Sequence, residues 1–186
     1  MRTGKYMSTP TNEYVITYGA KLYLIEKKWD VIAYNPPGSQ GTFTIPNPSK
    51  DGREKGQTGS ESPDVIAVKD GFVLIVECKP NFDSGDSLKL KRLSQDEQKM
   101  EVLDILIRRV CKANEIGLPE TLQYIYALAY SGQPHKIESL GFLNVIVSEL
   151  FDIRTIAARP SFKEYFRAEL APAADWPSEA LLLFED

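Results

Sequence analysis

A sharp reversal in the first half of the chain constrains the fold more than any other feature of the sequence. Residues 65–68 and 72–76 are two apolar runs rich in Val and Ile, and Asp70-Gly71 stands between them. Runs of this kind favour strands, and an Asp-Gly pair closes a tight hairpin because both residues tolerate positive φ. We therefore expect Asp64, at the start of the first strand, to lie beside Glu77, at the end of the second.

Two carboxylates and an ammonium are then expected at one end of an apolar sheet. Side chains alternate along a strand, so Glu77 and Lys79 should project from one face and Cys78 from the other. Burying such charges without good partners costs several kcal/mol, as an order of magnitude, whereas a divalent cation prefers oxygen ligands of this kind. In the alternative interpretation, Asp64 caps a turn and Glu77 and Lys79 form an ion pair at the rim of an ordinary α/β domain.

The pattern Pro63-Asp64, followed after 12 residues by Glu77-Cys78-Lys79, resembles the motif of the PD-(D/E)XK nuclease superfamily. The resemblance implies an α/β fold with a restriction-endonuclease-like αβββαβ core, in which helices flank a mixed central sheet. It also implies that Asp64, Glu77 and the backbone carbonyl of Cys78 hold Mg²⁺. Catalytic Lys79 would orient the attacking water and help to deprotonate it. Cleavage of the phosphodiester bond would then leave 5′-phosphate and 3′-hydroxyl ends.

Hydrophobic periodicity and capping signals predict elements in the same order. Thr9 is the expected cap of the first helix, and Ser94 with Glu97 forms a capping box before a later helix. A crossover through that helix makes the next strand parallel to the third. The predicted elements are a helix over 8–28, strands over 29–34, 65–68 and 72–76, a helix over 95–112, strands over 122–129 and 142–147, and a short helix over 136–140.

The first helix carries an acidic residue near each end, Glu13 and Glu26. If the first three strands form an antiparallel meander, the start of the helix lies near Asp64, and Glu26 lies about 20 Å away at 1.5 Å per residue. Many superfamily members carry an accessory metal ligand on this helix, and Glu13 is its best match. Alternatively, Glu13 is a solvated residue that the helix dipole favours.

The polar segment 39–62 is long for a connection and lies at the same end. We interpret it as a flap that faces DNA, with Arg53 and Lys55 as phosphate contacts, or alternatively as a disordered surface loop. Glu54 and Glu61 are alternative carboxylates for the metal.

A second basic cluster follows the motif. Its members Lys89, Lys91 and Arg92 are further candidates for contact with DNA phosphates, unless they only form the solvated entrance to a helix. Gln98 and Lys99 begin the next helix, where they could orient a water molecule or a phosphate.

The 186 residues suggest a single nuclease domain over 1–186, with a helical C-terminal extension over 151–186 that includes a helix from 161 to about 170. The apolar end 181–184 either caps the core or awaits a partner. No apolar run is long enough for a membrane span, and the N-terminus has no apolar signal core. Two cysteines inside predicted elements indicate free thiols in a reducing compartment, so we expect a cytoplasmic protein.

Charge and composition argue against several classes of function. A single histidine argues against zinc sites built on His clusters and against Ser-His or Cys-His catalysis. The net charge of −4, with no helix-turn-helix or zinc-finger pattern, argues against a stand-alone DNA binder. The chain resembles the small catalytic subunit of a heterodimeric type IIS restriction endonuclease, whose larger subunit recognises double-stranded DNA and nicks the other strand. An autonomous junction-resolving or repair nuclease, or a non-catalytic interaction module with this fold, are the alternatives.

Overall fold

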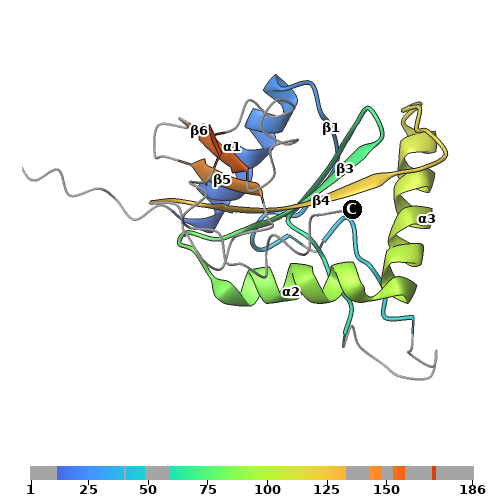
Figure 1. Cartoon of the computed structure of the whole chain (residues 1–186), viewed down its shortest axis with the longest axis horizontal. Helices are drawn as coiled ribbons and strands as arrows, with labels where there is room; N and C mark the ends of the chain where they lie inside the picture. Colours follow the sequence, from blue (N-terminus) through green and yellow to red (C-terminus); the bar gives the residue numbers. More distant parts are fainter. Residues whose placement is uncertain are drawn as a thin grey trace, which may run out of the picture.

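The computed structural model describes residues 12–39, 41–48, 59–132, 143–147, 153–157 and 169–170. Helices and strands alternate along it as in an α/β protein (Figure 1). The helices are α1 (Glu13–Glu26), α2 (Ser84–Gln95) and α3 (Glu97–Ala113). The strands are β1 (Asp30–Tyr34), β2 (Val65–Lys69), β3 (Phe72–Cys78), β4 (Gln123–Tyr130), β5 (Leu143–Val147), β6 (Ile153–Ala157) and β7 (Glu169–Leu170).

The strands form one mixed sheet in the order β1-β2-β3-β4-β5-β6-β7. β2 is antiparallel to both β1 and β3, whereas β4 is parallel to β3 and β5 is parallel to β4. A parallel neighbour requires a crossover, and α2 and α3 supply it. The predicted parallel pairing of the third and fourth strands is therefore confirmed.

The hairpin between β2 and β3 has the predicted turn. Val65 pairs with Val76 and Lys69 with Phe72, which leaves two residues for the reversal. Asp70 has φ 49° and Gly71 has φ 85°, so both adopt the left-handed conformation that such a turn needs. The start of β2 is consequently adjacent to the end of β3, and this places the candidate site.

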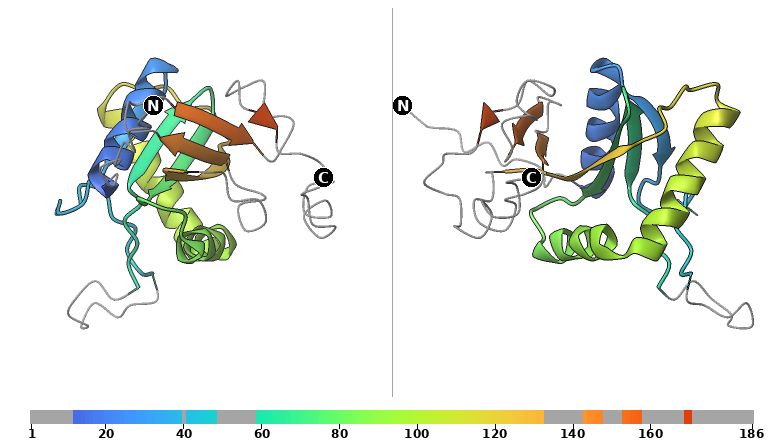
Figure 2. Two further views of the ribbon diagram at one scale, coloured as in Figure 1. Left: turned by 90° about the vertical axis from the view of Figure 1, so that its left-hand side faces the viewer. Right: turned by 45° about the vertical axis from the view of Figure 1, so that its right-hand side comes forward.

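Helices cover both faces of the sheet (Figure 2). Residues at alternate positions of β3 contact different helices: Leu74 and Val76 share a core with α1, and Val73 and Ile75 share one with α2 and α3. All four are fully or almost fully buried. The near-continuous apolar character of β3 in the sequence thus reflects burial on both sides.

The first helix begins later than the sequence predicts. Asn12, and not Thr9, caps α1 by accepting a hydrogen bond from the Val15 amide at 2.9 Å. Thr9 itself lies outside the described residues. Glu13 is therefore the first helical residue, and its side chain is at the very end of α1.

The helix predicted over 95–112 is present as α3, but the segment before it forms a further helix, α2, that was not predicted. The two helices form the arms of an L in Figure 1. Ser94 lies inside α2 and donates to the Lys91 carbonyl, so it is not the cap of α3. Asp96 has that role and accepts from the Lys99 amide at 3.0 Å. The α2 segment is polar and buries only Ser87, Leu90 and Leu93, and this narrow stripe gives a weak helical signal.

The C-terminal part contains strands where the sequence predicts helix. Residues 153–157 pair with β5, and 169–170 pair with β6. The β-branched residues Ile153, Thr155 and Ile156 favour this extension of the sheet, so a wholly helical extension over 151–186 is wrong. The segments 136–140, 161–168 and 181–184 lie outside the described residues. Among the described residues, every helix is too short or too polar to cross a lipid bilayer.

The turn offers a direct test of the hairpin. A methyl group at residue 71 would require an L-residue at positive φ and would lie 2.9 Å from Cγ of Pro119. We expect Gly71→Ala to lower the free energy of unfolding by about 1–3 kcal/mol in urea denaturation. Gly117→Ala is the matched control, because its φ is not positive and its added methyl group meets no atom within 4 Å. Equal effects of the two substitutions would contradict this account of the turn.

Candidate active site

Asp64 and Glu77 meet at one end of the sheet, as predicted. Oδ2 of Asp64 accepts a hydrogen bond from the backbone amide of Cys78 at 2.7 Å, so the carboxylate bridges the start of β2 and the end of β3. Asp64 and Glu77 are close enough for the charge of Asp64 to raise the pKa of Glu77. The hairpin therefore brings two carboxylates to one place.

Asn35 fixes the backbone of the Pro63-Asp64 pair. Its Nδ2 donates to the carbonyls of Pro63 at 2.8 Å and Phe43 at 3.1 Å, and its own amide donates to the Asp64 carbonyl at 2.8 Å. Its Oδ1 accepts from the Thr42 amide at 2.7 Å. Asn35 is not singled out by the sequence analysis. Its one visible signal is its position beside two prolines, where turns are common.

Glu77 is held by a lysine from α2. Its side chain is only 4% exposed, and its Oε1 lies 2.7 Å from Nζ of Lys89. The sequence predicts that Lys89 contacts DNA, whereas the structure pairs it with a motif carboxylate. Sequence reasoning missed this contact because it did not predict the helix that carries Lys89.

Lys79 is held by the first helix. Its Nζ lies 2.9 Å from Oε1 of Glu13, which places Glu13 at the expected end of the sheet. Glu77 and Lys79 line one small cavity, which agrees with the prediction that they project from one face. Glu77 contacts α2 through Lys89, and the long side chain of Lys79 contacts α1 through Glu13. The site thus has two ion pairs, and the pKa of Asp64 responds to charges from both.

Burial makes the ionised carboxylates costly. Desolvation raises the pKa of Glu77 to about 7, although Lys89 lowers it. Desolvation also raises the pKa of Asp64 to about 6, against the hydrogen bond from Cys78 and the charge of Lys89. Additional positive charge at this point would stabilise both carboxylates.

Lys79 is kept as an ammonium. Burial lowers its pKa, but the hydrogen bond and the negative charge of Glu13 outweigh burial and raise it above the ordinary value. A lysine with a raised pKa is a poor proton acceptor and a good source of positive charge. This favours charge stabilisation over the removal of a proton from water.

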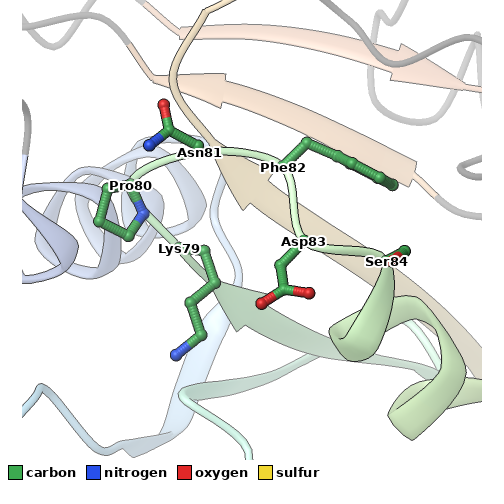
Figure 3. A pocket seen from close by; sticks show the side chains of 6 residues that line it. All are labelled: Lys79, Pro80, Asn81, Phe82, Asp83 and Ser84. Atoms are coloured by element: carbon green, nitrogen blue, oxygen red, sulfur yellow. The ribbon is translucent and has the colours of Figure 1, made fainter.

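An open cavity of about 390 Å³ begins at Lys79 and follows the segment that joins β3 to α2 (Figure 3). In Figure 3 the side chains of Lys79 and Asp83 are directed to the same side of this segment, and Asn81 is directed to the other. Lys79, Glu77 and Asp86 also line a smaller cavity next to it. Asp86, which sequence reasoning did not single out, therefore belongs to the site.

The site fits a cation that prefers oxygen ligands. Within the part of the chain that the structure describes, no three His, Cys, Asp or Glu side chains gather closely enough to hold a metal ion by themselves. A cation would therefore draw on Asp64 and Glu77 together with backbone carbonyl and water oxygens. In the cation-free protein, one oxygen of Asp64 accepts from the Cys78 amide and one oxygen of Glu77 accepts from Lys89. Two hard carboxylates with water suit Mg²⁺, which keeps several of its waters in proteins.

The backbone carbonyl of Cys78 would be a further oxygen ligand for a cation. The Lys79 amide donates to the Ala129 carbonyl on β4 at 2.9 Å. Successive residues of a strand direct their amides to opposite sides, so the carbonyl of Cys78 faces β2. The register of β2 with β3, continued by two residues, places Pro63 opposite Cys78. Because proline has no N–H, it donates nothing to this carbonyl, which suits the expected role of Cys78 as a ligand.

The other predicted contacts have mixed outcomes. Arg53, Lys55 and Glu54 lie outside the described residues. Lys91, Arg92 and Gln98 are exposed. Glu61 pairs with Lys99 at 2.5 Å, so these two residues hold each other.

Comparison with known proteins places the chain in no family: no protein-family model matches it, and no curated protein is significantly similar to it. What the site does must therefore follow from its own geometry and charge.

The raised pKa values predict how stability depends on pH. In the cation-free protein, Glu77 and Asp64 bind protons more tightly when folded than when unfolded, so their contribution is complete below about pH 4 and is lost as pH rises through about 6 and 7. We therefore expect these two groups to lower the free energy of unfolding as pH rises, in urea denaturation between pH 4 and 8.5. In Glu77→Gln the part of the decline near pH 7 should disappear. An unchanged profile in the variant would contradict the burial of an ionisable Glu77.

Proposed function

We propose that the protein is a Mg²⁺-dependent DNA endonuclease of the PD-(D/E)XK type that hydrolyses a phosphodiester bond in one strand. The observation that carries this proposal is the meeting of Asp64 and Glu77 with Lys79 at one end of the sheet, beside an open cavity. The order of α1, three antiparallel strands, crossover helices and a parallel strand supports a restriction-endonuclease-like αβββαβ core. An additional helix, α2, is inserted in this order.

The division of roles follows from charge. Asp64, Glu77 and the carbonyl of Cys78 would hold Mg²⁺. The bound ion supplies a more acidic water and positive charge against the phosphate. Phosphodiester cleavage builds negative charge on the phosphoryl oxygens, and fixed positive groups stabilise that charge.

Lys79 supplies the fixed positive group of the protein. As an ammonium beside the cavity, it orients the attacking water and stabilises the charge that develops on the phosphate. Glu13 acts through Lys79: its carboxylate holds the ammonium in place and keeps it protonated. Glu13 is thus a positioning residue in this mechanism, and its expected role as an accessory metal ligand is not needed.

Recognition of double-stranded DNA is assigned to a larger partner. The chain has a net charge of −4, and a stand-alone DNA binder usually presents a broad basic surface. Exposed Lys91 and Arg92 on α2 offer a small basic surface near the site for local phosphate contacts. This balance fits a cleavage subunit of a type IIS restriction endonuclease, in a heterodimer whose larger subunit reads the site.

Dependence on a partner can be measured directly. We expect the gene to lie beside genes for a larger restriction-type protein and a DNA methyltransferase, and the two restriction proteins to co-purify. With Mg²⁺, the complex should cut both strands of plasmid DNA at a defined position, while the isolated chain shows little cleavage. Efficient cleavage of branched or damaged DNA by the isolated chain would instead indicate an autonomous nuclease.

Matched substitutions test the residues within the complex. Asp64→Asn, Glu77→Gln and Lys79→Met should each slow cleavage of the strand assigned to this subunit by about 100-fold or more. Glu13→Gln should slow it by about 10-fold, because it acts through Lys79. The controls are Glu26→Gln at the other end of α1 and Lys112→Met at the end of α3, both exposed. If Glu77→Gln cuts as fast as these controls, the chain is a non-catalytic module and the proposal fails.

A further inference from the structure

The lysine that touches a motif carboxylate is Lys89, and the motif lysine is engaged elsewhere. Lys89 reaches Glu77 from α2 at 2.7 Å, whereas Lys79 is bonded to Glu13 at 2.9 Å. The motif Glu77-Cys78-Lys79 gives no reason for a second ammonium at the site. The role of Lys89 is therefore a separate question from the role of Lys79.

The surroundings of Lys89 indicate what its charge does. Glu77 is 4% exposed, so water contributes little to the stability of its carboxylate. Lys89 contacts buried Glu77 directly, and its charge also favours the ionised form of half-buried Asp64, so a single ammonium serves both acids. The side chain of Lys89 is itself 34% exposed, so it can turn to solvent without breaking the core. It resembles a movable counter-ion more than a fixed structural partner.

We propose that Lys89 is the counter-ion of the cation-free site, and that a divalent cation must displace its ammonium from Glu77 in order to bind. This inference rests on the proposed cation site. An ammonium and a divalent cation beside the same carboxylates repel each other at short range, where the interior of the protein screens charge weakly. Once released, the ammonium lies next to the place where a DNA phosphate would bind, on the helix that also carries exposed Lys91 and Arg92.

Calcium binding to the full chain tests the competition without any cleavage. We would titrate Ca²⁺ by isothermal calorimetry at pH 8.5, where Asp64 and Glu77 are ionised. We expect Lys89→Met to bind Ca²⁺ about 3- to 10-fold more tightly than the wild type, because the competing charge is gone. Lys89→Arg keeps a charge and should remain near the wild type. Lys112→Met removes an exposed charge at the end of α3 and should also leave the affinity unchanged.

Thermal unfolding separates this role from a purely structural one. Saturating Ca²⁺ should raise the melting temperature of Lys89→Met by more than it raises that of the wild type. A structural ion pair predicts an equal loss of stability with and without Ca²⁺, and that result would overturn the inference. Lys89→Gln serves as a second variant if Lys89→Met does not fold.

The outcomes also separate this inference from the proposed function. If the wild type binds Ca²⁺ and the Lys89 variants bind it no more tightly, the counter-ion role is wrong and the proposed cation site stands. If Asp64→Asn and the wild type both fail to bind Ca²⁺ and Mg²⁺, the cation site itself is wrong, and the inference falls with it.

Discussion

The hydrogen bond from the Cys78 amide to the Asp64 carboxylate holds the site together. At this position a regular antiparallel ladder would continue from β2 to β3, but Pro63 has no N–H, and its carbonyl accepts from Asn35. The side chain of Asp64 takes the place of the missing ladder partner. One carboxylate thus closes the end of the sheet and stands beside Glu77, which couples folding of the hairpin to assembly of the acidic pair.

Two effects on the carboxylates oppose each other at the site, and burial is the larger of them. Burial disfavours the charges of Asp64 and Glu77. The ammonium of Lys89, on α2, favours both charges, and that of Lys79, directly after β3, favours the charge of Asp64. Paired buried charges seldom add net stability, because desolvation consumes most of the gain from attraction. An arrangement of this kind is more easily understood as preparation for a ligand than as a contribution to folding. Lys89 belongs to α2, and Lys79 is held by Glu13 of α1, so helices on opposite faces of the sheet (Figure 2) each act on the charge of the site.

Local features of the sequence predicted the central part of the site. The Asp70-Gly71 turn fixes the strand register, and that register alone brings Asp64 beside Glu77. The meander then places the start of α1, and with it Glu13, at the same end. These predictions succeeded because each needs only strand periodicity, one turn type and a connection rule. The restriction-endonuclease-like identity of the core and the nuclease activity remain proposals.

Features that depend on contacts between residues far apart in the chain could not be predicted from the sequence. α2 buries few apolar residues, so its helical signal is weak, and the pairing of Lys89 with Glu77 depends on where that helix packs. Asn35 acts through backbone groups of residues 42, 43, 63 and 64, which no spacing rule brings together. The contact of Lys79 with Glu13 likewise depends on where α1 packs. The strands after residue 150 have β-branched residues but no strong turn signals at their borders.

A bridge between Ile45 and Glu61 draws the two arms of the segment between β1 and β2 together. The Glu61 side chain is anchored in turn to Lys99, on the first turn of α3. The backbone three residues before Asp64 is therefore tied both to the segment that follows β1 and to the start of α3, so the approach of the chain to the acidic pair is anchored from two directions.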